Sequence, residues 1–573
     1  MLRICGRATR ALGPLKMDDP QERYQETASG RATVSGAVLL LLSTALAGIL
    51  VVANAFVLDV VVGESRLTWH AVMLSLEAAS IAGALVCWPS LRPAARWDWL
   101  EIIGMLAVGG VFLGHITHLA PADWMPISFS VDCSHQHLLV NYIYSHHGLP
   151  DGVDYLYIYD DYPVGPSVLA AFLAHLFGVL PAQTMHPLAA LFVAVQVMLA
   201  YGISVELLPR CPSSYVLAAF AAWMAFLVYP YTVQVFARYF YSNMMMGDLM
   251  VLLALWITTV RERLSPALMA SLTICLVFGC LNSYPAWLPF VAAPLIASVM
   301  FDRRTPVAKR GVLAAIVVTV MLILTIITLV DQWDFITWFA PSRDRRLTPS
   351  WQSLGGAFVI LVGWGVWTLA RNWRQYSGLV LFLVIDALLV AALYSVAFLD
   401  KLTLYIPDKT FYFNVFLLTV LVALGLRQVW QRFVSLKLAK RWQACVVVIA
   451  LGLVVLVGVN SWFPPSAVYP ITLDEYRVAY QLAQEMPDAE LTYLVRDQAT
   501  FYWIYGCILN HTHDLMARHE QWQANVPTYD NWIHNDEAPS RAVVSDLTML
   551  PQEDGRWHVI IRSGNSGVIE KAP

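Results

Sequence analysis

The sequence predicts an α-helical polytopic membrane protein with about 13 transmembrane helices and a small C-terminal α/β domain outside the membrane. Three observations give this fold class. The 573 residues are 58% hydrophobic and only 13% charged, whereas a soluble chain carries about 25% charged residues. The mean hydropathy is +0.59, and the apolar residues fall in blocks of about twenty, the length of a spanning helix. After residue 462 the chain becomes polar.

The apolar blocks define the transmembrane domain, for which we expect residues 34–462. The predicted spans are 34–62, 69–88, 99–120, 186–208, 214–236, 241–260, 266–282, 284–300, 310–330, 354–371, 377–398, 411–427 and 443–462. Each is within or close to the ~17–25 residues that a spanning helix needs. Residues 1–33 are basic and polar and are predicted to form a cytoplasmic tail, with Met17 as an alternative start.

The Lys and Arg residues predict the topology, because cytoplasmic loops carry the excess of positive charge. If the short apolar stretch 166–180 does not cross, one side of the membrane carries 22 basic residues and the opposite loops carry seven. If 166–180 crosses, the later clusters change sides and the bias disappears. We therefore expect 166–180 to lie in the outer interface or to re-enter the membrane. The N-terminus is then cytoplasmic and the C-terminus extracytoplasmic.

Residues 463–573 are predicted to form the extracytoplasmic domain, since no apolar block in them is long enough to span. The pattern from Asp474 to Met486 predicts an amphipathic helix that Pro487 ends. Two short strands are expected at 491–495 and 558–561. Of the eight cysteines, only Cys133 and Cys507 clearly face the outside, so no essential disulfide is expected.

The longest loop between spans, 121–185, lies outside and is rich in Asp, His and Tyr. Long ordered loops on a rigid scaffold often carry function. Residues 132–147 are predicted to form a helix that ends at Gly148-Leu149-Pro150. Spacings of three and four residues put one set of side chains on a single helical face: Asp132, His135, Leu139, Tyr142 and His146.

These residues carry a resemblance to a known family. The run from Asp132 to Pro150, then Tyr159-Asp160-Asp161-Tyr162-Pro163-Val164-Gly165-Pro166 and the helix over 167–178, resembles the first outer loop of GT-C glycosyltransferases. In that superfamily an Asp after a spanning helix precedes an amphipathic helix, a Pro-rich element and a juxtamembrane helix. The motif covers about 132–178, whereas the layout of spans covers most of the chain. Two spans precede the span that leads into this loop, where the commonest family layout has one.

The resemblance implies a glycosyltransferase that moves a sugar from a polyprenyl-phosphate donor to an acceptor glycan or lipid. The transfer would occur on the outer face of a bacterial inner (plasma) membrane, in the synthesis of the cell wall or envelope. An arabinofuranosyltransferase is the narrower expectation, because those enzymes also carry an external C-terminal domain. A mannosyltransferase or a lipid A-type sugar transferase fits the sequence almost as well.

The chemistry requires a general base for the acceptor hydroxyl. We expect Asp132 to be this base, and the alternative is a helix N-cap. Asp161 is a second catalytic candidate, and Asp160 a candidate for binding the acceptor. Together they could also hold a divalent cation with Asp132, unless they form only an acidic turn before Tyr162. His135 and Tyr162 are further candidates for binding substrate.

A leaving polyprenyl phosphate needs cations at the outer interface. Arg238 and Lys409 lie among aromatic residues at the outer ends of predicted spans, which suits a lipid phosphate; the alternative is a pair of interfacial anchors. A second basic cluster, Arg343, Arg345 and Arg346, suits phosphate or sugar contact or simply attracts lipid headgroups. The histidine pairs 135/137 and 146/147 do not converge on a helix, so no zinc site is expected.

Two other classes of function stay open. A transporter or flippase would use charges within the membrane, and the candidates are Glu77, Asp248 and Asp386, acids without a partner that the sequence makes obvious. A ligase or polymerase of lipid-linked glycans would share the outer site but take a pyrophosphate-linked donor. The formal net charge of -4 is too balanced to indicate a nucleic-acid partner.

Overall fold

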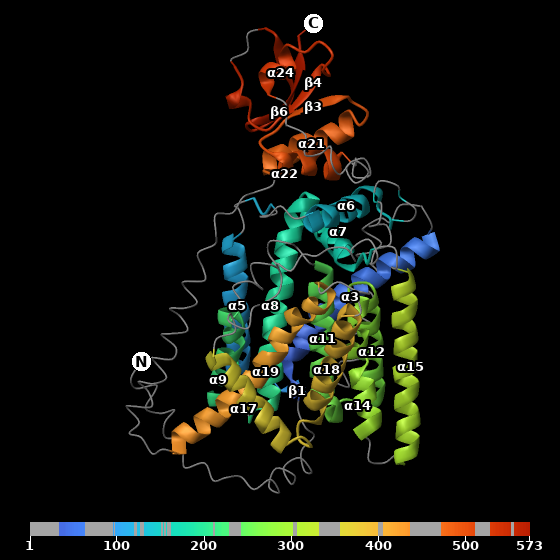
Figure 1. The fold of residues 1–573 in the computed structure, drawn as a ribbon, viewed down its shortest axis with the longest axis vertical. Helices are drawn as coiled ribbons and strands as arrows, with labels where there is room; N and C mark the ends of the chain where they lie inside the picture. Colours follow the sequence, from blue (N-terminus) through green and yellow to red (C-terminus); the bar gives the residue numbers. More distant parts are fainter. Residues whose placement is uncertain are drawn as a thin grey trace.

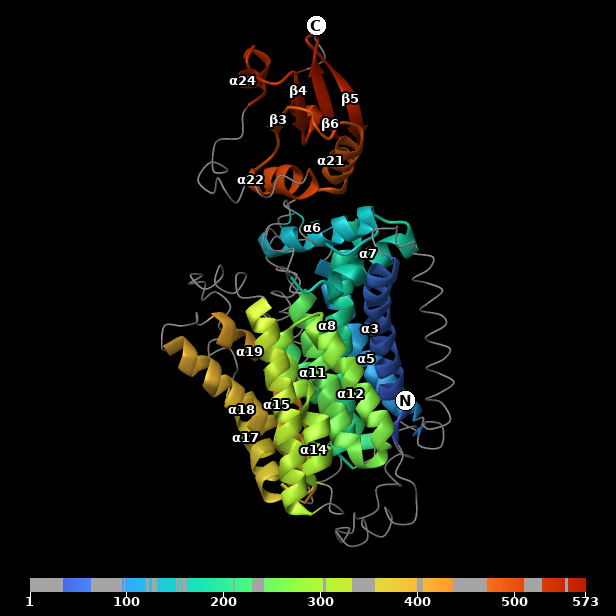
Figure 2. The same cartoon turned by 90° about the vertical axis from the view of Figure 1, so that its right-hand side faces the viewer.

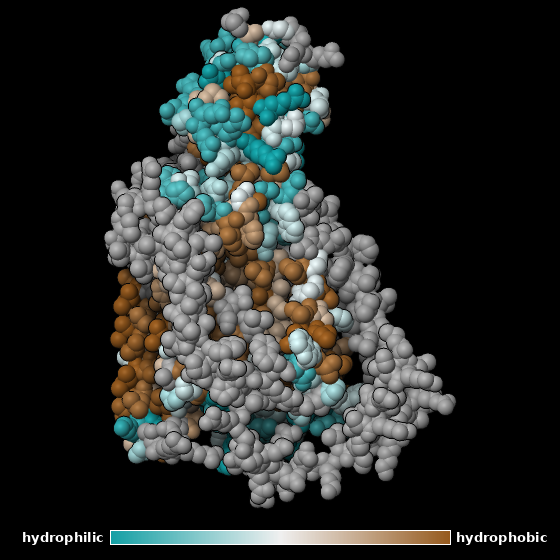
Figure 3. Space-filling view, turned by 180° about the vertical axis from the view of Figure 1, so that it is seen from behind, coloured by the Kyte–Doolittle hydropathy of each residue, from teal (hydrophilic) through white to brown (hydrophobic). Residues whose placement is uncertain are grey.

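The computed structural model describes residues 34–62, 95–96, 98–119, 123–125, 131–150, 153, 156, 162–209, 212–228, 242–301, 306–331, 356–398, 405–435, 471–509, 528–551 and 555–572. A bundle of long helices carries two shorter helices at one end, and an α/β domain lies beyond them (Figures 1 and 2). In the space-filling view, hydrophobic side chains cover much of the visible bundle, whereas most of the α/β domain is hydrophilic (Figure 3).

The bundle helices follow the predicted spans. They are α3 (Gly36–Val62), α5 (Trp99–Leu119), α8 (Pro181–Leu207), α9 (Pro212–Val228), α11 (Ser242–Val260), α12 (Pro266–Leu281), α14 (Ala293–Phe301), α15 (Val307–Asp331), α17 (Gly356–Arg371), α18 (Ser377–Phe398) and α19 (Tyr405–Ser435). Among the described residues, five helices are long and apolar enough to cross a membrane. The predicted spans 69–88 and 443–462 lie outside the described residues.

The predicted span 284–300 is a broken helix. It consists of the single 3-10 turn η3 (Pro285–Trp287), the four-residue α13 (Leu288–Val291) and then α14. Proline lacks the N–H that an α-helix needs and its ring crowds the preceding turn. Prolines 285, 289 and 294 each lie at the first or second position of one of these three elements, so none of them continues the preceding one.

The apolar stretch 166–180 forms a short helix, α7 (Gly165–Phe177), of 13 residues. At a rise of 1.5 Å per residue it is about 20 Å long, less than the ~30 Å of a bilayer core. Gly178 ends the helix at φ 61, a left-handed conformation that glycine adopts without strain, and Pro181 then begins α8. This length agrees with a stretch that does not cross the membrane.

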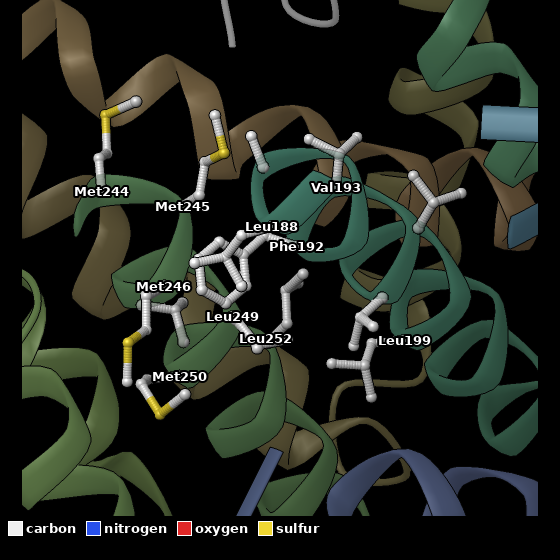
Figure 4. Close-up of a cluster of buried hydrophobic side chains, with 14 of the residues drawn as sticks. Leu188, Phe192, Val193, Leu199, Met244, Met245, Met246, Leu249, Met250 and Leu252 are labelled. Atoms are coloured by element: carbon white, nitrogen blue, oxygen red, sulfur yellow. The ribbon is translucent and has the colours of Figure 1, made fainter. Parts of the chain in front are cut away.

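The bundle core lies between α8 and α11. A cluster of Leu, Phe, Val and Met side chains fills the space between the two helices (Figure 4). Gln196 of α8 donates from Nε2 to the carbonyl oxygen of Met245 at 2.6 Å, which fixes the register of the two helices. Methionine is flexible and fills irregular gaps between helices.

A polar cluster closes the bundle end opposite α7, which we call the Arg263 end. Ser35 and Ala95–Arg96 lie there in a two-stranded parallel pair, β1 (Val34–Ser35) with β2 (Ala95–Arg96). The Ser35 N–H donates to Glu206 at 3.0 Å, and its hydroxyl donates to Glu101. Arg263 forms a salt bridge with Glu206 at 2.5 Å. These contacts join the ends of α3, α5 and α8.

The C-terminal domain, residues 471–572, holds a four-stranded sheet with the order β3-β4-β6-β5. The strands are β3 (Leu491–Leu494), β4 (Arg541–Val544), β5 (Trp557–Ser563) and β6 (Ser566–Lys571); β3 and β4 are parallel and the other pairs antiparallel. The predicted helix corresponds to α21 (Leu473–Glu485), which starts with a Thr472/Glu475 capping box. Pairing of Arg496 with Glu475 at 2.9 Å ties α21 to the segment after β3.

Candidate functional site

The predicted helix of the 121–185 loop is present as α6 (Val131–His146), at the bundle end that we call the α6 end. The residues Cys133 to Val140 are all buried, although most α6 side chains near the start are polar. The helix lies between α7 on one side and the C-terminal domain on the other. Toward α7, the Ser167 hydroxyl donates to Oε1 of Gln136 at 3.5 Å.

The C-terminal domain contacts α6 through two His–Tyr pairs. His137 Nε2 lies 2.7 Å from the hydroxyl of Tyr476, which belongs to α21. His135 Nε2 lies 2.5 Å from the hydroxyl of Tyr502, in the π-helix η5 (Tyr502–Ile508). The Trp503 ring also packs against His137, with centroids 5.2 Å apart. All four paired side chains are almost fully buried.

Apolar residues surround these pairs and join the two segments into one small core. Its buried members are Leu138, Leu139, Leu156, Tyr502 and Cys507. Three belong to the loop and two to the C-terminal domain, and Tyr162 packs against the cluster from its edge. Cys133 and Cys507 are both buried free thiols. A hydrogen bond to Ser134 of α6 acts on the Cys507 thiol, although burial dominates and raises its pKa to about 12.

Burial lowers the pKa of both imidazoles, His135 and His137, to about 3. Taking a cation out of water disfavours the charged form, so the neutral form of each ring is the one that fits this contact. Neutral imidazole has one donor and one acceptor nitrogen, and in both rings the tyrosine hydroxyl is the partner of Nε2. The arrangement is therefore a contact between neutral groups.

The proline-rich turn after α6, at residues 162–166 of the loop, packs against the bundle. The Gly165 N–H donates to the carbonyl oxygen of Asn282 at 2.8 Å, and the Asn243 side chain donates to the carbonyl oxygen of Pro163. A Cβ atom at Gly165 would clash with the Asn282 carbonyl, so this close approach requires glycine. The turn is thereby fixed to the start of α11 and the end of α12.

Lys409 lies next to the same region. Its Nζ is 5.5 Å from the ring centroid of Tyr284, two residues after Asn282. Tyr284 packs against Trp287 with centroids 5.0 Å apart, and Trp287 donates from Nε1 to Oδ1 of Asp248 at 2.8 Å. Asp248 is fully buried, and its Oδ2 has no hydrogen-bond partner among the described residues.

Contacts between neighbouring elements link α6, which holds Asp132, to the segment beside Lys409. Asp132 is in the first turn of α6, and a series of contacts leads from this helix to Lys409: Gln136–Ser167, Gly165–Asn282, Tyr284–Lys409. His135 is buried against Tyr502 rather than in an open surface. A contact of His135 or Tyr162 with substrate stays a prediction. Asp160, Asp161, Arg238 and the cluster Arg343, Arg345 and Arg346 lie outside the described residues, as does Glu77.

Several residues of the site were not predicted from the sequence. They include Tyr476, Tyr502 and Trp503, and the Tyr284–Trp287 pair. Two of the three acids that the sequence left without a partner have neutral ones: Asp248 accepts from Trp287, and Asp386 accepts from Asn414 at 3.0 Å. Within the described part of the chain, no group of three His, Cys, Asp or Glu residues is arranged to hold a metal ion.

Comparison with known proteins adds a structural likeness. No protein-family model matches the sequence, and no curated protein matches it. Among solved structures, the chain is similar to that of ArnT from Cupriavidus metallidurans bound to undecaprenyl phosphate. The match has a TM-score of 0.40 and 15% identity, and it covers 82% of this chain and 97% of that chain.

Proposed function

We propose that the chain is a GT-C-type glycosyltransferase that moves a sugar from a polyprenyl-phosphate donor to an acceptor glycan or lipid. The proposal follows from the resemblance of residues 132–178 to the first outer loop of that superfamily. The transfer site is the α6 end of the bundle, on the outer face of the membrane. An envelope arabinofuranosyltransferase is the narrower form of the proposal.

One observation carries the proposal: a series of contacts links α6, which holds Asp132 in its first turn, to the cation Lys409. Gly165 contacts Asn282, and Lys409 lies over Tyr284, two residues further on. Asp132 of the loop and Lys409 near the start of α19 (Tyr405–Ser435) are 277 residues apart in sequence. Sugar transfer from a lipid phosphate needs both a base and a phosphate-binding cation.

The proposed reaction assigns a role to each group. The acceptor hydroxyl oxygen forms a bond to the anomeric carbon of the sugar, and its proton goes to the Asp132 carboxylate. The bond between that carbon and the phosphate oxygen breaks, and its electron pair leaves with the polyprenyl phosphate. Lys409, with Arg238, stabilises the negative charge that grows on the phosphate. Asp160, Asp161 and Tyr162 are proposed to bind the acceptor, and Asp161 is the second candidate base; His135, the other candidate from the sequence, is buried against Tyr502.

A lipid donor also needs apolar surface beside the phosphate site. Helix α15 packs against η3, the segment that holds Trp287, and most of its apolar side chains are exposed. Of the most apolar 18 residues in Val307–Ile327, only 6% are buried inside the protein, whereas 94% are buried in the corresponding part of Ser242–Arg263. An exposed apolar helix next to the Tyr284–Trp287 segment supports a donor site that the prenyl chain enters from the lipid bilayer.

The proposal is tested with the full chain purified in lipid nanodiscs. Polyprenyl-phosphate-linked pentoses and hexoses are the donors, and membrane glycolipid extracts are the acceptors. The wild type is expected to form a new glycosidic bond. Asp132→Asn removes the base and should lower kcat by about 10²–10⁴-fold while the protein still folds. Asp123→Asn, an exposed carboxylate in the same loop, is the matched control and should retain activity.

Full activity of Asp132→Asn would contradict the assignment of the base. Movement of the donor lipid between leaflets without a new glycosidic bond would indicate a flippase instead. Transfer only from a pyrophosphate-linked glycan would indicate a ligase or polymerase.

A further inference from the structure

We propose that the C-terminal domain is a positioning part of the transfer site: it holds α6, and with it Asp132, in one register through the pairs His135–Tyr502 and His137–Tyr476. The inference rests on the proposed function, because it concerns the placement of the proposed base. Tyr476 and Tyr502 are positioning residues, since they act through α6 and not on the substrate.

The two pairs fix α6 from one side only. Both imidazoles project toward the C-terminal domain, one to α21 and the other to η5. Gln136, between them in sequence, bonds to Ser167 of α7. The start of α6 is therefore held between two partners that belong to different parts of the chain.

Polar pairs inside an apolar contact specify a single arrangement. Leu138, Leu139 and Cys507 would tolerate a shift of α6 along the domain, because apolar contact is not directional. A shifted α6 would bury His135 and His137 without their hydroxyl partners, which is unfavourable. The pairs thus exclude the shifted arrangements that the apolar surface alone would allow.

Asp132 lies in the part of α6 whose position the His–Tyr pairs fix. His135 follows Asp132 by three residues, so the two lie about 4.5 Å apart along the helix axis. The same helical turns hold the proposed base and the first His–Tyr pair. Misplacement of a catalytic group by about 1 Å is enough to lower a rate by about 10²-fold.

The chain carries its own reporter for this contact. Cys507, a residue of η5, is fully buried in the cluster that it forms with the α6 leucines Leu138 and Leu139. While the domain is docked, a thiol reagent has no access to Cys507; when α6 and the domain separate, the thiol becomes accessible. The rate of alkylation by a membrane-impermeant maleimide, read at Cys507 by mass spectrometry, therefore measures docking without any assay of transfer.

The test uses Tyr476→Phe, Tyr502→Phe and the double variant in the full chain. Each substitution removes one hydroxyl and keeps the ring. Tyr493→Phe is the control: this buried tyrosine packs against Phe501 and Tyr505 inside the domain. The double variant is expected to alkylate at Cys507 at least tenfold faster than the wild type. Its kcat should fall at least tenfold, with the apparent KM for the donor changed by less than twofold. Tyr493→Phe should match the wild type in both.

A matched apolar swap separates positioning from folding. In His135→Leu with Tyr502→Phe, both polar partners of one pair are gone, so neither is left buried and unpaired. Protection of Cys507 should recover toward that of the wild type, while kcat stays below it because the register is no longer specified.

The outcomes distinguish the two proposals. If the double variant alkylates faster but keeps the wild-type kcat, the positioning role is overturned and the transferase remains. Unchanged alkylation in the double variant also overturns it. If the wild type transfers no sugar from any donor, the proposed function fails, and the positioning role fails with it.

Discussion

The two ends of the helical bundle hold their polar groups in different ways. At the Arg263 end, Glu206 accepts from Ser35 and is paired with Arg263, so a buried carboxylate meets a cation directly. At the α6 end, Asp248 accepts from the Trp287 indole and from no other group among the described residues, and Lys409 lies over the ring of Tyr284. The first end matches charge with opposite charge inside the protein. The second places a cation over an aromatic ring.

The largest expected effect is a loss of stability from a substitution at the Arg263 end. Arg263→Gln removes the Arg263 guanidinium from the Glu206 carboxylate, whose side chain is 1% exposed. Removal of one partner of a buried pair costs about 3–5 kcal/mol. We expect about 3 kcal/mol of lost stability, because water reaches part of Arg263. Thermal unfolding in detergent measures it, with kcat per folded molecule unchanged.

The matched control for this substitution is Glu262→Gln. Glu262 pairs with Arg261 at 3.5 Å, but its side chain is 84% exposed. An exposed pair contributes about 0–1 kcal/mol. A loss in Glu262→Gln as large as that in Arg263→Gln would mean that burial does not distinguish the two pairs.

The contact between α6 and the C-terminal domain should weaken in acid. The imidazoles of His135 and His137 have a pKa of about 3 in the folded protein and an ordinary pKa of 6.5. The stabilising effect of the neutral rings is fully present above pH 6.5 and is lost as the pH falls toward 3, because the unfolded state binds protons first. Between pH 7 and 5.5 the two rings together predict a loss of about 2.5 kcal/mol.

Unfolding measured against pH checks this prediction. His137→Gln keeps a polar group near Tyr476 but does not titrate, so the pH dependence should shrink by about half. His534, an exposed residue of the C-terminal domain, supplies the control, and His534→Gln should keep the wild-type pH dependence. An unchanged pH dependence in His137→Gln would show that His137 is not buried in the neutral form.

Local patterns in the sequence predicted the elements but not their partners. Apolar runs gave the spans, and three-and-four spacing gave the helix that became α6, since both patterns depend on neighbours in sequence. The face with His135 and Leu139 was predicted correctly as a shared face. What covers it lies far along the chain: Tyr502 is 367 residues from His135, and Tyr476 is 339 from His137.

Other features were also beyond local patterns. Strands β4 and β6 are short, and no alternation in them stands out from their surroundings. The π-helix η5 packs against α6, a contact that its own sequence does not reveal. The role of Lys409 beside Tyr284 could be suspected from its aromatic neighbours, but the turn at Asn282 that joins it to the loop could not.

The comparison of the two ends leads to one direct measurement. Lys409 and Arg432 lie near opposite ends of α19, and each has its cation over an aromatic ring, at 5.5 Å from Tyr284 and 5.6 Å from Trp364. The affinity of the full chain for polyprenyl phosphate is measured for Lys409→Ala and Arg432→Ala. The transfer site at the α6 end predicts at least a tenfold weaker affinity, about 1.4 kcal/mol, in Lys409→Ala and no change in Arg432→Ala. Equal affinities in the two variants, or a loss only in Arg432→Ala, would contradict it.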